Sequence, residues 1–73
     1  MTIQTAKKDE VYHLFTGKDG KIHIESDGKE AVINGFLSIK PGKPLSVNVN
    51  RILDDGRLGP AETLVSSTVT KVN

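Results

Sequence analysis

Few residues of this chain combine the type and the spacing that a catalytic or metal site needs. The two histidines are His13 and His23, and Glu25 lies two residues after His23, on the same face of an expected strand. A zinc site needs three or four converging ligands, and this trio has no spacing typical of one. Asp54-Asp55-Gly56 lacks the further oxygen ligands of a calcium loop and is interpreted as a turn. We therefore predict no metal site.

Nucleophilic catalysis has no better candidate. The chain has no cysteine, and its Ser66-Ser67-Thr68 run lies in a strand-like segment without the G-x-S-x-G frame of a nucleophile elbow. A chain of 73 residues also rarely builds a water-excluding pocket around a positioned triad. We predict no catalytic residue, no cofactor and no enzymatic activity.

A nucleic-acid site is an alternative with more residues in its favour. Gly17-Lys18-Asp19-Gly20 matches the Gly-x-x-Gly loop of KH domains, but that loop joins two helices, and here an alternating strand follows. On a small barrel, bases could instead stack on aromatic rings beside lysines. The formal net charge of +1 is low for a dedicated nucleic-acid-binding protein. The candidate residues for this alternative are Tyr12, Phe15, Lys18 and Lys21.

A protein interface needs no motif, and the region from Arg51 to Arg57 has the composition of one. The apolar pair Ile52-Leu53 lies between arginines and beside an acidic turn. Arginine next to apolar anchors is typical of interfaces, and a small sheet also has edge strands with free backbone donors and acceptors. From Lys40 to Leu53 there are three basic residues and no acid. The predicted partner-binding residues are Lys40, Lys43, Arg51, Ile52, Leu53 and Arg57.

The strongest signal for an element that could position these residues is the stretch Glu30–Lys40, which holds the densest run of apolar residues. Its Asn34-Gly35 pair separates two runs rich in Val, Ile, Phe and Leu. This pattern predicts a type I′ β-hairpin, because Asn tolerates positive φ and Gly adopts it freely. One long buried strand with a glycine bulge is the alternative.

Two other segments, Lys21–Glu25 and Leu45–Asn50, alternate apolar and polar residues as half-buried strands do. In the first segment the alternation turns Ile22 and Ile24 toward the core and His23 toward water. In the second it turns the leucine and both valines inward. The phase shifts after residue 50, which indicates a bulge or the end of the strand.

Two further segments are compatible with either a helix or a strand. Thr5–Phe15 has a threonine that could cap a helix and apolar residues at helical spacing, whereas Val11–Thr16 is rich in β-branched and aromatic residues. We favour a strand from Val11. Glu62–Val72 is predicted to be the last strand, with a short helix after Pro60 as the alternative.

Short strands separated by Gly and Pro turns predict a mainly β fold. We expect a small antiparallel sheet or half-barrel of about five strands, with room for one short helix. Residues 1–9 are predicted to form a flexible N-terminal segment and residues 10–73 a single domain. No apolar run reaches the length of a membrane helix, and the first residues lack the apolar core of a signal peptide. We expect a cytoplasmic protein without a membrane partner.

In size, lack of cysteine and lack of a catalytic motif, the chain resembles the small phage-encoded proteins that bind bacterial RNA polymerase. The resemblance covers the length and the balanced charge, with 26% charged residues, and no motif, so it transfers no site. It implies a non-catalytic regulator that docks on a polymerase subunit in the host cytoplasm and blocks initiation or alters termination. The alternatives are a small barrel that binds single-stranded nucleic acid and a phage structural or assembly protein that self-associates.

Overall fold

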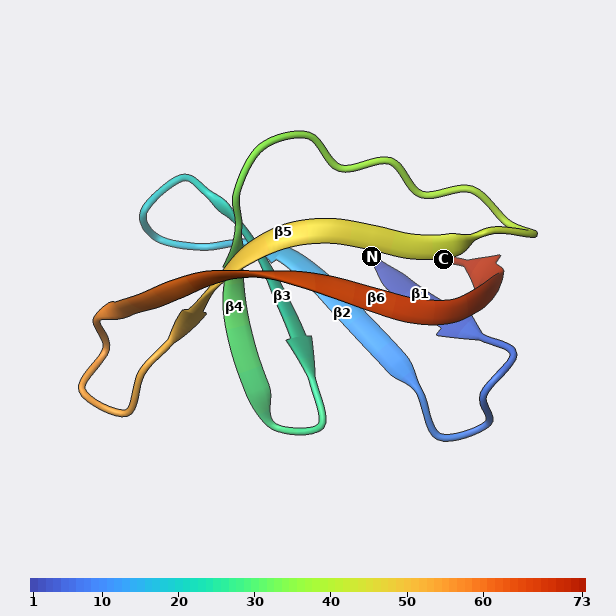
Figure 1. The fold of residues 1–73 in the computed structure, drawn as a ribbon, viewed down its shortest axis with the longest axis horizontal. Coiled ribbons are helices and arrows are strands. Elements are labelled where there is room, and N and C mark those ends of the chain that lie inside the picture. Colours follow the sequence, from blue (N-terminus) through green and yellow to red (C-terminus); the bar gives the residue numbers. More distant parts are fainter.

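The computed structural model describes all of residues 1–73 and contains six β-strands and no helix (Figure 1). Each strand pairs antiparallel with the next one along the chain, and the first also pairs with the last, so the sheet closes into a barrel. The predicted mainly β, barrel-like fold is confirmed, with six strands in place of about five. The strands are β1 (Thr2–Thr5), β2 (Val11–Thr16), β3 (Ile22–Ser26), β4 (Lys29–Ile33), β5 (Pro44–Ile52) and β6 (Leu58–Val72).

The core of the barrel is built from apolar residues that alternate along the strands. Because side chains of a strand point to opposite faces in turn, every second residue can enter the barrel. All six strands contribute, and the prediction that the leucine and valines of β5 face inward is confirmed. The nine core residues are Ile3, Tyr12, Leu14, Ile24, Ala31, Leu45, Val47, Val49 and Val69.

Both segments that were compatible with a helix form strands. Val11–Thr16 is β2, and the last strand begins at Leu58, four residues before the predicted start at Glu62. A short isolated helix is marginal in water, whereas β2 gains ladder hydrogen bonds to β1 and β3 on its two sides. Pairing with neighbouring strands therefore determines that both segments form strands.

The barrel begins closer to the N-terminus than the predicted boundary at residue 10. Thr2–Thr5 pairs with both β2 and β6, and the amide of Thr2 donates a hydrogen bond to the carbonyl of Asn73 at 2.9 Å. Ile3 is fully buried in the core. A strand of four residues with one large apolar side chain gives too short an alternation to be seen in the sequence.

The hairpin predicted at Asn34-Gly35 does not form. β4 ends at Ile33, and residues 34–43 form a long connection along the barrel to β5 (Figure 1). One edge of β4 pairs with β3 and the other with β5, where Ile33 lies opposite Val49. Because both edges of β4 are paired, no edge is left for residues 36–40 to form a hairpin with it.

A turn of the predicted type lies one hairpin earlier, between β3 and β4. A type I′ turn needs positive φ at both central residues. Asp27 has φ 54° and Gly28 has φ 76°, whereas no other non-glycine residue has positive φ. Ser26 and Lys29 flank the turn and pair with each other. Asp-Gly therefore takes the conformation that the sequence predicted for Asn-Gly.

Candidate functional site

Arg51, near the end of β5, lines three adjoining hollows. The first, about 230 Å³, is the mouth of the barrel, and five apolar side chains contribute to its wall. The second, about 470 Å³, lies along the β5–β6 hairpin. The third, about 390 Å³, lies between this hairpin and the β3–β4 turn. We call these three hollows together the Arg51 surface. Besides Arg51, the residues shared between its hollows are Lys29, Glu30, Ile52 and Asp54.

The local sequence of the β5–β6 hairpin produces this surface. The register of β5 against β6 shifts between Asn50 and Ile52, which is the phase change predicted from the sequence. A β carbon on Gly59 would lie 3.0 Å from a methyl carbon of Leu53 and 3.2 Å from the carbonyl oxygen of Arg51. Glycine at this position therefore lets the start of β6 lie close to the end of β5.

Ion pairs hold both arginines of the hairpin in defined orientations. The guanidinium of Arg51 donates to the two carboxylate oxygens of Glu62 at 2.9 and 3.3 Å. The guanidinium of Arg57 donates to Asp55 at 2.6 Å. Both pairs are largely exposed, so each contributes little to stability. Their main effect is to orient the charged rim of the surface.

The structure brings four of the six predicted partner-binding residues together. Arg51, Ile52, Leu53 and Arg57 lie on the β5–β6 hairpin, beside Leu58, whose side chain is 51% exposed. The other two, Lys40 and Lys43, line a separate hollow of about 210 Å³ at the start of β5. β5 is nine residues long, so its two ends lie about 26 Å apart. The predicted residues therefore fall into two groups at opposite ends of one strand.

The four candidates of the nucleic-acid alternative do not share one face. Tyr12 is buried in the core, whereas Phe15 is 43% exposed on the outside of the barrel. The ring of Phe15 is stacked on His23, with ring centroids 5.4 Å apart. Lys18 and Lys21 are exposed on the loop between β2 and β3. The barrel wall separates Tyr12 from the other three residues, because the position of Tyr12 in the alternation turns it inward.

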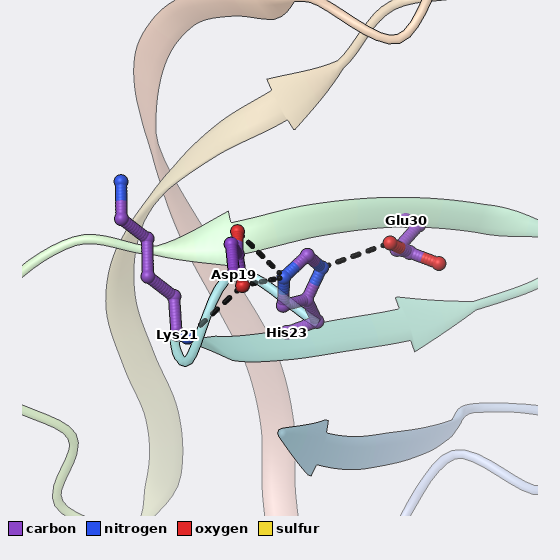
Figure 2. Close-up of polar contacts among 4 residues, drawn as sticks. All are labelled: Asp19, Lys21, His23 and Glu30. Atoms are coloured by element: carbon purple, nitrogen blue, oxygen red, sulfur yellow. Dashed lines mark hydrogen bonds and ion pairs between the residues drawn. The ribbon is translucent and has the colours of Figure 1, made fainter. Parts of the chain in front are cut away.

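The environment of His23 differs most from the one that the sequence predicts. His23 lies on the outer face of β3, as predicted, but it is only 7% exposed because the loop of residues 17–21 covers it. Figure 2 shows its ring between two carboxylates. Its Nε2 lies 2.9 and 3.1 Å from the two oxygens of Asp19, and its Nδ1 lies 2.9 Å from an oxygen of Glu30. We call these three residues the His23 clamp.

The arrangement of the His23 clamp favours the imidazolium form. Only a doubly protonated ring can donate an N–H to both carboxylates. The hydrogen bond to Asp19 raises the pKa of His23, and contacts with Glu30 add to the rise, together outweighing the opposite effect of burial. The same hydrogen bond lowers the pKa of Asp19, as does the bond from the amide of Lys21. With both nitrogens engaged, His23 has none free to act as a general base or as a metal ligand.

The loop above His23 depends on a glycine. A β carbon at Gly17 would collide with Nε2 and Cδ2 of the His23 ring. The amide of Gly17 donates to the carbonyl of Lys21 at 2.8 Å, which closes the loop. The sequence signal for this clamp is the Gly17-Lys18-Asp19-Gly20 turn placed just before a strand histidine. That signal indicates a turn but gives no sign that the turn folds over the ring.

A second expectation about β3 was also wrong. Ile22 was predicted to face the core, but it is 45% exposed at the end of the barrel. Its strand partner Thr16 is the last residue of β2 and is also exposed. The alternation sets the direction of the side chain, but beyond the end of the neighbouring strand no residue covers it.

Comparisons with known proteins found no matching family model, no matching curated protein and no matching solved structure. No helix in the structure has the length and apolar character needed to cross a membrane. No group of three or more histidine, aspartate and glutamate side chains is arranged to hold a metal ion. The Arg51 surface and the His23 clamp are therefore the two arrangements that bear on function.

Proposed function

We propose that this protein is a non-catalytic binding protein that docks on a larger protein through the Arg51 surface. The observation that carries the proposal is the position of exposed apolar side chains beside arginines at a concave surface. Leu53 is 39% exposed and lines one of the hollows together with Ile52 and Arg51. Apolar anchors with arginine, surrounded by a polar rim, are typical of protein interfaces.

The size of the barrel mouth indicates what it would accept from a partner. Its volume of about 230 Å³ is below the roughly 300–1,000 Å³ of ligand pockets for drug-sized molecules. A cavity of about 150 Å³ is enough for a benzene ring. One apolar side chain of the partner therefore fits the mouth. Arg51 and Lys29 on the rim can donate hydrogen bonds to a neighbouring carboxylate of the partner.

The charge of the surface favours a protein over a nucleic acid as the partner. Two basic and four acidic side chains line the hollows: Lys29, Arg51, Glu30, Asp54, Asp55 and Glu62. A phosphate backbone would meet more carboxylates than cations here. Binding to nucleic acid depends on a stripe of positive charge, and this surface does not provide one.

The partner that we propose is bacterial RNA polymerase. The support for it is the resemblance in length, charge balance and lack of cysteine to small phage-encoded regulators. Docking of the Arg51 surface on a polymerase subunit would block initiation or alter termination without any chemical step. The protein would then act in the cytoplasm of the host.

The test is an NMR titration of ¹⁵N-labelled protein with purified bacterial RNA polymerase fragments at low salt. We expect shifts at residues 51–58 and at the β3–β4 turn. Leu53→Ser should weaken binding about tenfold, the effect of losing one moderate interface anchor. The control is Val65→Ser, which removes an exposed apolar side chain of β6 that lines none of the three hollows and should leave binding unchanged.

Each other outcome has a definite meaning. If no fragment binds at low salt, the polymerase is not the partner. If Leu53→Ser and Val65→Ser weaken binding equally, the Arg51 surface is not the docking site. Salt-sensitive binding of a single-stranded oligonucleotide, with shifts at Phe15, Lys18 and Lys21, would support the nucleic-acid alternative in place of this proposal.

A further inference from the structure

Glu30 belongs to both arrangements described above. Its carboxylate oxygen Oε2 lies 2.9 Å from Nδ1 of His23, so it forms one side of the His23 clamp. Glu30 is also one of the residues that line the barrel mouth and the hollow beside the β3–β4 turn, together with Lys29 and Arg51. With 40% of its side chain exposed, Glu30 is open to solvent on the hollow side. It is therefore a direct physical link between the buried ring and the Arg51 surface.

We propose that His23 regulates the Arg51 surface through Glu30, by holding its carboxylate when the ring is protonated and releasing it when the ring is neutral. In the released state, Glu30 is a free negative charge beside Lys29 and Arg51. This inference rests on the proposed function of the Arg51 surface as a docking site. It adds proton-dependent control to that function.

The geometry decides which of the two carboxylates is released. A neutral imidazole keeps one N–H, and its other nitrogen presents a lone pair. Asp19 contacts Nε2 through both oxygens, and the amide of Lys21 holds the same carboxylate at 2.9 Å. Glu30 has a single contact, to Nδ1. The remaining proton therefore stays on Nε2 with Asp19, and the lone pair of Nδ1 faces Glu30 and repels it.

The groups around His23 support a two-state change of this kind. Asp19 and Lys21 come from the β2–β3 loop and Glu30 comes from β4, whereas Phe15 on β2 and Val32 on β4 carry no charge. The other titratable groups on this face are Glu25, which lies opposite Glu30, and His13, which pairs with Glu25. Because Asp19 and Glu30 raise the pKa of His23, the clamped state persists to a higher pH than an ordinary histidine would allow. The surface then changes as the pH rises through the pKa of His23.

Release of Glu30 changes what the surface can bind. Arg51 is already paired with Glu62 at 2.9 Å, and both side chains are about half exposed. A free Glu30 adds a second carboxylate that can compete for Arg51 and can pair with Lys29. An acidic group on a partner would then find fewer free donors. We expect affinity for such a partner to fall by up to about fivefold across the transition, the size of one exposed ion pair.

The test is an NMR pH titration of the labelled protein alone, from pH 6 to pH 10. The ring signals of His23 report its own proton, and the Arg51 Nε and Lys29 amide signals report the surface. We expect all three to shift with one common midpoint. The matched variants are Glu30→Gln and Asp19→Asn, each of which removes one carboxylate of the clamp while keeping the shape of the side chain.

The two variants separate the proposed link from a general structural effect. In both, the midpoint of His23 should fall. In Asp19→Asn the Arg51 and Lys29 signals should still follow the new midpoint, whereas in Glu30→Gln they should no longer follow it. Surface signals that stay constant through the His23 titration in the unmodified protein would overturn the proposal, as would signals that still follow it in Glu30→Gln. Because no partner is present, this result is independent of whether docking itself succeeds.

Discussion

His23 shows how a loop can change the chemistry of a single side chain. The alternation along β3 turns the ring to the outer face, where an isolated strand would leave it in water. The loop above it reduces its exposure to 7%, and Asp19 and Glu30 take up its two nitrogens. The result is a ring whose protonated form is favoured, because the hydrogen bond to Asp19 and the contacts with Glu30 raise the pKa of His23.

Gly17→Ala tests the packing over this ring. The backbone of Gly17 is not in the left-handed region, so alanine fits its conformation, but the added β carbon would collide with the ring of His23. Overpacking of this kind typically lowers the free energy of unfolding by about 1–3 kcal/mol. Urea unfolding at pH 6.5 measures the loss.

The control for Gly17→Ala is the same change in a His23→Ala background. Without the ring the one remaining close neighbour is Oδ1 of Asp19 at 2.9 Å, the end of a side chain that can turn away. The additional loss in the double variant should therefore be within about 0.5 kcal/mol. An equal loss in both backgrounds would show that the effect of Gly17→Ala does not come from His23.

At the scale of elements, the connection between β4 and β5 is the part of the chain that differs most from its prediction. Its ten residues hold no strand, yet Leu37 and Ile39 pack partly against the core while Phe36 is fully exposed. The end of the connection is tied to β6, where the amide of Gly42 donates to the carbonyl of Val69 at 2.8 Å. The segment therefore acts as a cover for the barrel without joining its sheet.

Ile39→Ser and Phe36→Ser test this description of the connection. Ile39→Ser removes apolar contact with the core and should lower the free energy of unfolding by about 1–2 kcal/mol. Phe36→Ser changes a side chain without contacts and should leave it within about 0.5 kcal/mol of the original value. Thermal and urea unfolding measure both. A larger loss for Phe36→Ser would mean that its ring packs on the barrel in solution.

At the scale of the whole molecule, β1 is the strand that closes the barrel. It lies between β2 and β6, and without it both of those strands would have free edges. The two ends of the chain meet here: Thr2 and Asn73 exchange backbone hydrogen bonds of 2.9 and 2.8 Å. The N-terminal ammonium of Met1 also donates to the carbonyl of Leu14 at 3.1 Å.

Removal of residues 1–5 should therefore abolish cooperative unfolding. The deletion takes Ile3 out of the core, breaks the ladders to β2 and β6, and exposes two strand edges that favour aggregation. Circular dichroism during thermal unfolding, with sedimentation velocity for aggregation, measures the outcome. Cooperative unfolding of the shortened chain at a similar temperature would contradict a closing role for β1.

The matched control is a circular permutant that keeps every residue. A short glycine linker joins Asn73 to Met1, and new ends are opened between Asp55 and Gly56 in the exposed β5–β6 turn. Because Thr2 and Asn73 are neighbours, the linker introduces little strain, and permutation is best tolerated at exposed turns. We expect this variant to unfold cooperatively, with a lower midpoint than the unpermuted chain.

The sequence by itself determined the features that depend on neighbouring residues. The alternation in Leu45–Asn50 determined a strand with its apolar side inward, and Asp27-Gly28 determined a tight turn, because both follow from local sterics. The mainly β class follows from the sum of such segments. The composition of residues 51–57 predicted an interface in the segment that forms the end of β5 and the turn to β6.

Only the tertiary structure decided which strands pair and what covers each side chain. β4 takes β5 as its partner and leaves Asn34-Gly35 without a hairpin, and β1 pairs with β6 from the other end of the chain. The burial of His23 and the separation of Lys40 from Arg51 follow from those pairings. Each strand has only two edges, so which strands pair depends on every other strand in the chain. A short segment of sequence holds no information about those other strands.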